Sequence, residues 1–265
     1  IGCSLDVAGT RFSAILIMIA DRLCTITKDK DRRNRVILYL TAFVFITIVG
    51  NMIARTTTIG VIVALTYIVV LSIINQKQSG TNYSFLWKWI TAVVIITIIA
   101  VTFLYNTNPN IRTNIRFGFE GFFSLAETGK WEVHSNDILK NMVVFPDNLK
   151  TWVIGDGYFD NPYDSDPFYS GVRWKGFYQN TDIGYLRFIF YFGIFGLMVL
   201  IWYFIKVGTT CVKRFFSHRL LFAILLLLNF IIWCKVSTDI FLVFALFLCL
   251  REEEWDKPKE MTIIK

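Results

Sequence analysis

The chain has 265 residues, of which 55% are hydrophobic and only 18% are charged, a balance that a water-soluble fold would have to hide in an implausibly large core. Its net charge of +7 does not indicate nucleic-acid binding, because the basic residues lie in short segments beside apolar runs. The runs lack the alternation of a β-barrel strand. We therefore predict an all-α integral membrane protein with about six to seven transmembrane helices.

Four apolar runs are long enough to cross about 30 Å of hydrocarbon at about 1.5 Å per residue. They are Val36 to Ala54, Thr58 to Ile74, Leu86 to Leu104 and Asp182 to Ile205. An earlier run, Phe12 to Ala20, is interrupted by Asp21 and Arg22. It is either a span that continues to about Thr27 or a truncated remnant of one.

The last apolar run, Leu220 to Leu250, is too long for one ordinary span and carries Lys235 and Asp239 near its centre. We predict two short helices joined by a tight turn. The alternative is one tilted helix with a buried Lys235, which would move the acidic tail to the other side of the membrane.

Basic residues predict the orientation. They gather at positions 28–35 and 206–219, which should be cytoplasmic loops. Alternation along the chain then places 105–181 outside, and this aromatic-rich loop should fold into short helices against the membrane. The predicted organisation comprises N-terminal transmembrane helices in 1–104, a large periplasmic loop in 105–181, C-terminal transmembrane helices in 182–250 and a cytoplasmic tail in 251–265.

Several arginines lie where predicted helices meet the outer loop. Arg55 occupies a short turn between two spans, Arg112 and Arg116 follow a third, and Arg187 lies about one turn inside the next. Neither Arg55 nor Arg116 has an acidic neighbour in the sequence. Because guanidinium groups bind diphosphate oxygens in a bidentate manner, these four residues predict a lipid-diphosphate site. The alternative is interfacial arginines that extend to lipid head groups.

Three residues are candidates for a general base. Asp182 is either a helix N-cap or a carboxylate that takes a proton from a sugar hydroxyl, and Glu120 and His134 are otherwise ordinary loop residues. Asp164 and Asp166 look like the DxD pair of metal-dependent sugar transferases, although a solvated loop is favoured. No His or Cys cluster has metal-ligand spacing, so we predict neither a metal nor a cofactor.

Three strings carry a family resemblance: Trp152-Val153-Ile154-Gly155-Asp156-Gly157-Tyr158, Thr181-Asp182-Ile183-Gly184-Tyr185-Leu186-Arg187 and Phe190-Tyr191-Phe192-Gly193-Ile194. With the Arg-Thr turn at Arg55 and the large outer loop, their order resembles the Wzy-type O-antigen and capsular polysaccharide polymerases, which share a superfamily with O-antigen ligases. The resemblance covers roughly Arg55 to the C-terminus. Members of that family usually have more spans, and this chain begins with Ile1 rather than Met, so we expect a C-terminal portion of a longer protein.

The resemblance implies a metal-independent inverting glycosyltransferase of the bacterial inner membrane. It would polymerise undecaprenyl-diphosphate-linked oligosaccharide repeat units into O-antigen, capsule or exopolysaccharide at the outer face. Its partners would be that lipid-linked oligosaccharide, the bilayer, and a chain-length regulator and flippase, with no nucleic acid. Outer-loop arginines of the family are thought to hold the diphosphate, which matches Arg55 and Arg116 and, less closely, Arg187.

Two alternatives stay open. An O-antigen ligase uses the same donor but transfers the glycan to lipid A core, and loop sequence does not separate the two acceptors. A lipid-linked sugar transporter would need charges along the middle of several spans, which Thr58 to Ile74 and Leu86 to Leu104 lack.

Overall fold

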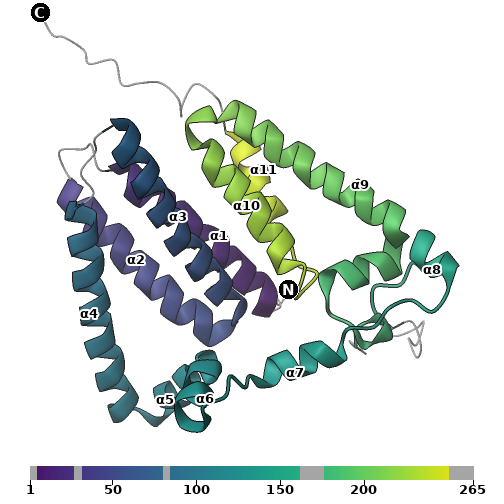
Figure 1. Cartoon of the computed structure of the whole chain (residues 1–265), viewed down its shortest axis with the longest axis horizontal. Coiled ribbons are helices and arrows are strands. Elements are labelled where there is room, and N and C mark those ends of the chain that lie inside the picture. The colour runs from purple at the N-terminus through teal and green to yellow at the C-terminus, as the bar shows by residue number, and fades with distance from the viewer. Residues whose placement is uncertain (1–4, 27–31, 80–83, 162–175, 251–265) are drawn as a thin grey trace, which may run out of the picture.

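The computed structural model describes residues 5–26, 32–79, 84–161 and 176–250 (Figure 1). Helices dominate these ranges, which confirms the all-α prediction. Four helices have the length and apolar composition to cross a membrane: α2 (Arg32–Ile53), α3 (Thr56–Ser79), α4 (Ser84–Thr107) and α9 (Gly184–Arg214). They correspond to the four long runs of the sequence and indicate a multi-pass membrane protein.

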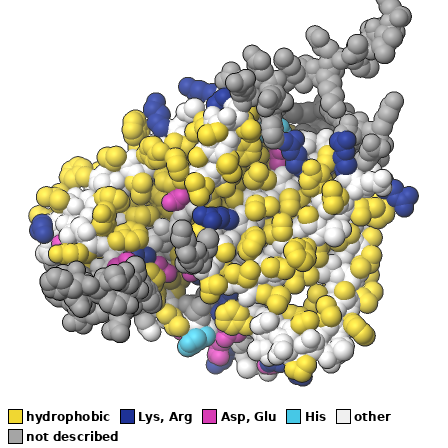
Figure 2. Space-filling view, turned by 180° about the vertical axis from the view of Figure 1, so that it is seen from behind, with side chains coloured by type: hydrophobic (Ala, Val, Ile, Leu, Met, Phe, Trp, Pro, Cys, Tyr) yellow, Lys and Arg dark blue, Asp and Glu magenta, His cyan; other side chains and the backbone are white. Residues whose placement is uncertain are grey.

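The outer surface of these helices is apolar, as a bilayer requires. Ile96, Ile99 and Phe103 of α4 are 64%, 64% and 68% exposed. Figure 2 shows hydrophobic side chains spread widely over the visible face, with few charged side chains among them. Exposed apolar surface of this extent is unfavourable in water, so lipid is the solvent that these side chains fit.

Helix α1 (Leu5–Thr25) lies inside the N-terminal half, packed against α2 and α3. The short run Phe12 to Ala20 is thus part of a 21-residue helix. It is less uniformly apolar than the four spans, because it also carries Asp6, Arg11, Asp21 and Arg22. Close packing on α3 depends on Gly60, where a Cβ atom would lie 2.3 Å from the Cα atom of Ser13.

The last apolar run folds as two helices, α10 (Arg219–Ile232) and α11 (Phe241–Cys249). This agrees with the predicted pair of helices, although the connection, 233–240, is longer than a tight turn. Hydrogen bonds hold the connection in place, since Trp233 Nε1 donates to Thr238 O at 3.0 Å and Ile240 N donates to Asn229 Oδ1 at 3.1 Å. The acidic tail lies outside the described residues.

Helix α9 has 31 residues in two parts, and the part after residue 193 is about 31 Å long at 1.5 Å per residue, enough to cross the hydrocarbon. The basic residues at 206–214, predicted as part of a loop, form its last turns instead. The helix breaks at Gly193, where φ is 70°, and Figure 1 shows the bend. A short 3₁₀ turn, η3 (Phe216–His218), then connects α9 to α10.

The described residues of the segment 105–181 form four short helices and a 3₁₀ turn: α5 (Pro109–Gly118), α6 (Glu120–Thr128), α7 (His134–Asn141), α8 (Leu149–Val153) and η2 (Tyr178–Asn180). Asn108 caps α5 by accepting hydrogen bonds from Asn110 N and Ile111 N. In Figure 1 these short helices run along one end of the molecule, from α4 to α9. The segment therefore covers the ends of the long helices on a single side.

Candidate functional site

A cavity of about 360 Å³ lies at the end of the helices that the short helices cover. Five chemically active side chains line it: Asp6, Arg55, His134, Asp182 and Lys235. They come from the first turn of α1, the α2–α3 turn, the start of α7, the residue before the N-cap of α9, and the α10–α11 connection. The fold thus brings together three residues that the sequence nominated and two that it did not.

Arg55 is held against the wall of the cavity by the α5–α6 region. Its Nη2 atom lies 2.7 Å from Glu120 Oε2, its Nε atom donates to Phe117 O at 3.1 Å, and its guanidinium lies 4.3 Å from the centre of the Phe117 ring. The acidic partner absent from the neighbouring sequence is therefore supplied by α6. The Arg55 side chain is only 17% exposed, so its positive charge is held in a fixed position beside the cavity.

Arg116 and Arg112 do not line the cavity. Arg116 lies 2.6 Å from Glu127 Oε1 and also donates to Tyr105 OH at 3.4 Å. Arg112 lies over the Tyr105 ring at 5.2 Å. Both side chains contact groups of α4, α5 and α6, and neither lines the cavity that Arg55 lines.

Arg187 is buried, with a side chain only 6% exposed, and both terminal nitrogens of its guanidinium donate to protein groups. Nη1 donates to Asp182 Oδ1 at 3.3 Å and to Ser237 Oγ at 2.8 Å. Nη2 donates to Phe159 O at 2.9 Å and to Asp160 Oδ1 at 3.1 Å. The residue therefore joins the outer loop and the α10–α11 connection to α9, and it positions Asp182.

Asp182 is not the N-cap of α9, since Ile183 occupies that position and no side chain caps the helix. The carboxyl group faces the cavity and is 20% exposed. Burial raises its pKa to about 6, against the opposing effect of Arg187. A carboxyl group with that pKa is ionised at neutral pH and is better matched to proton transfer than an ordinary aspartate.

Glu120 and His134 have different surroundings. Glu120 does not line the cavity, and its two oxygens lie near Arg55 and the backbone N of His134, which donates to Oε1 at 3.5 Å. His134 lines the cavity at the first residue of α7. Glu120 thus orients neighbouring groups, while His134 remains available to the cavity as a second candidate base.

Lys235 and Asp6 complete the cavity and are connected through Thr56. Lys235 Nζ donates to Thr56 Oγ1 at 3.3 Å, and Thr56 Oγ1 donates to Asp6 Oδ1 at 3.0 Å. Burial lowers the pKa of Lys235. In the sequence, Lys235 stands out as a lone cation in an apolar run. Its place beside the same cavity as Arg55 follows only from the way α10 and α11 fold.

The three strings of the family resemblance lie around the first part of α9. The break at Gly193 leaves carbonyls of the preceding turn without helical donors, and the loop after α8 supplies them: Asp156 N donates to Phe190 O at 2.6 Å and Gly157 N to Tyr191 O at 3.2 Å. The remaining string, residues 181–187, contains Asp182 and Arg187.

Asp164 and Asp166 lie outside the described residues. Comparisons with protein-family models, with curated proteins and with solved structures found no match to this chain.

Proposed function

We propose that this chain belongs to a membrane glycosyltransferase that joins polyprenyl-diphosphate-linked oligosaccharides into a longer polysaccharide. The main observation that supports this proposal is the cavity at one end of the apolar helices, which Arg55, Lys235 and Asp182 line together. Two cations suit a diphosphate, and a carboxyl group whose pKa is about 6 suits removal of a hydroxyl proton. The grouping of the three resemblance strings around α9 supports the same assignment.

The reaction is a substitution at the anomeric carbon of the donor chain. The acceptor sugar hydroxyl attacks that carbon from the face opposite the diphosphate, and a new glycosidic C–O bond forms as the C–O bond to the diphosphate breaks. The electron pair leaves with the polyprenyl diphosphate, and Asp182 takes the hydroxyl proton. Inversion at the anomeric carbon follows from this geometry.

The cations act on the leaving group, where negative charge grows as the bond breaks. Each well-placed donor of this kind typically contributes about 10² to 10³ in rate, and a general base about 10² to 10⁴. Arg55 presents a planar fork that matches phosphate oxygens, and Lys235 contributes a more mobile point charge. Arg187 maintains the position of Asp182 through its hydrogen bond.

The proposed topology has six to seven crossings in the bacterial inner membrane. The four long helices are joined by α1 and by the α10–α11 pair, and the short helices α5–α8 cover the outer, periplasmic end. The basic residues at 206–219 then lie on the cytoplasmic side. This orientation places the cavity where a lipid-linked glycan exported by a flippase would arrive.

The test is polymerisation by the purified whole protein in liposomes. Undecaprenyl-diphosphate repeat units are supplied without nucleotide and with a metal chelator, and products are separated by size. We expect a ladder of longer glycans. A product that stops after one transfer to lipid A core would replace the polymerase by a ligase, and strict dependence on a divalent metal would contradict the proposed mechanism.

A further inference from the structure

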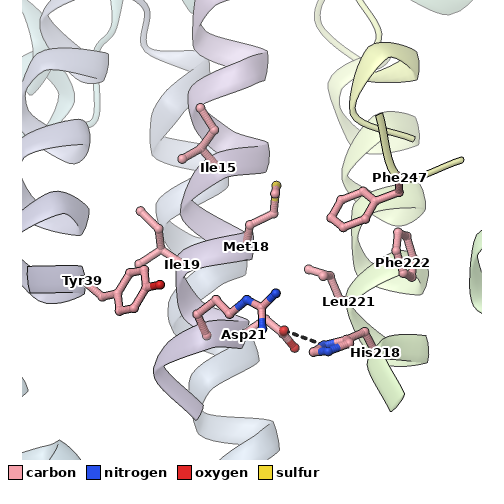
Figure 3. Close-up of a pocket in the computed structure, with 10 residues that line it drawn as sticks. Ile15, Met18, Ile19, Asp21, Tyr39, His218, Leu221, Phe222 and Phe247 are labelled. Atoms are coloured by element: carbon pink, nitrogen blue, oxygen red, sulfur yellow. Dashed lines mark hydrogen bonds and ion pairs between the residues drawn. The ribbon is translucent and has the colours of Figure 1, made fainter. Parts of the chain in front are cut away.

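A second polar site lies at the opposite end of α1, away from the proposed reaction. Asp21, which is 4% exposed, accepts a hydrogen bond from Tyr67 OH at 2.7 Å. Its other oxygen lies 2.8 Å from His218 Nδ1, the contact marked in Figure 3. A carboxylate buried among membrane helices is costly unless it is paired, so this trio is a built polar feature joining α1, α3 and η3.

Asp21 and His218 of this trio line one end of a cavity of about 210 Å³ between α1 and α10. Arg22 and Tyr39 line the same cavity and add a cation and a hydroxyl group. The remaining wall is apolar. Figure 3 shows Ile15, Met18 and Ile19 of α1 on one side and Leu221, Phe222 and Phe247 on the other.

The cavity continues into a second one, of about 540 Å³, because Ile15, Met18 and Phe247 line both. We call the two together the α1–α11 cleft. It extends along α1 from Arg22 to Arg11. The eleven residue-to-residue steps between them rise about 16 Å, close to half of the hydrocarbon thickness of about 30 Å. The cleft is therefore about as deep as one leaflet.

We infer that the α1–α11 cleft binds one anionic phospholipid, with its phosphate at Arg22 and an acyl chain along the apolar wall. Charge and shape favour this occupant, because a cation and a hydroxyl group lie at the Arg22 end and apolar side chains line the cleft from there to Arg11 at its other end. His218 and Tyr67 serve the site by satisfying the Asp21 carboxylate, which would otherwise repel a phosphate. The inference does not depend on the proposed glycosyltransferase activity.

Native mass spectrometry of the purified protein in detergent tests this site. The protein is titrated with phosphatidylglycerol or with phosphatidylcholine of identical acyl chains. We expect one saturable phosphatidylglycerol site, favoured over phosphatidylcholine by about five- to tenfold, as one cation near a head group provides. Arg22→Gln should remove that preference, and Met18→Trp should reduce binding of both lipids by filling the cleft.

Lys213→Gln is the matched control, because it removes an exposed cation from the same end of the molecule. It should leave the preference unchanged. Equal binding of the two lipids by the unaltered protein, or an undiminished preference in Arg22→Gln, would overturn the inference. If the protein formed a dimer when lipid was removed, the occupant of the cleft would be a second copy of the chain, and the inference would be wrong. If Met18→Trp does not fold, the head-group comparison and Arg22→Gln still decide the matter.

Discussion

At the scale of single residues, the same side chain serves different purposes according to its partners. Arg187 is surrounded by Asp160, Asp182 and backbone and hydroxyl acceptors, so its charge is already neutralised within the protein. Arg55 is paired with Glu120 and lines the cavity. Of the four arginines nominated from the sequence, Arg55 is the one that lines the cavity, and it is the arginine that we expect to act on the diphosphate.

Arg55→Ala should lower polymerisation by about 10² or more, because it removes a cation from the leaving group. Arg55→Lys keeps the charge but loses the fork and should recover only part of the activity. Glu120→Gln tests the structural alternative, since it removes the ion pair while leaving Arg55 in place. The measurement is ladder formation at matched protein levels, with Lys140→Ala, whose side chain is 77% exposed, as control. If Glu120→Gln lost as much activity as Arg55→Ala, holding α6 would be the role of Arg55.

Asp182 predicts a pH dependence. Its pKa is raised from 3.8 to about 6, so the carboxyl group is still protonated at pH values where an ordinary aspartate is ionised. Below about pH 6 the rate should fall about tenfold per pH unit, because the base is lost, and above it the rate should level off. Initial rates between pH 4.5 and 8 measure this. Asp182→Asn should lower the rate by about 10² to 10⁴ and remove the inflection; an inflection that persists would assign the base to another group, His134 first.

At the scale of elements, the bend of α9 explains how the outer loop is attached. Carbonyls freed at the break accept hydrogen bonds from the backbone after α8, so the loop is joined to the helix by main-chain contacts. Arg187 then adds side-chain contacts to Phe159 and Asp160. The cavity depends on this attachment, because Asp182, which lines the cavity, lies between the outer loop and α9 in the chain.

Gly193→Ala should destabilise the protein more than an ordinary surface glycine substitution. Its φ is +70°, and a Cβ atom there would lie 2.1 Å from Val153 O, so backbone strain and a clash add together. Gly157→Ala is the matched control, since its φ is +76° but nothing lies within 4 Å. Strain alone typically costs about 1–3 kcal/mol. Thermal unfolding in detergent should show the larger shift for Gly193→Ala; equal shifts would mean that α8 does not pack on the break.

At the scale of the whole molecule, one apolar core unites the two halves. Leu16 and Ile17 of α1, Leu225 of α10 and Phe244 of α11 are fully buried in a single cluster. The Asp21–His218 pair adds a polar link between the halves at the end opposite the cavity. Polar and charged side chains therefore lie at both ends of the apolar core.

The orientation of those ends predicts the result of cysteine labelling. In a version lacking its own cysteines, Glu132→Cys should react with a membrane-impermeant maleimide in intact spheroplasts, because α5–α8 are expected outside. Lys213→Cys should react only after permeabilisation. Both side chains are exposed, so access to the reagent depends on the membrane alone. The reverse pattern would invert the topology and remove the cavity from the periplasmic face.

The sequence by itself determined the membrane class, the four long spans and the helical pair at the C-terminus, because these follow from local hydrophobicity and length. It also nominated Arg55, His134 and Asp182. Only the tertiary structure decided that these three share a cavity with Lys235 and Asp6, that Arg112 and Arg116 lie elsewhere, and that Arg187 is occupied by partners. The physical reason is that pairing and burial of a charge depend on which helix ends meet in space, and the residues that meet here are separated by as many as 229 positions, as Asp6 and Lys235 show.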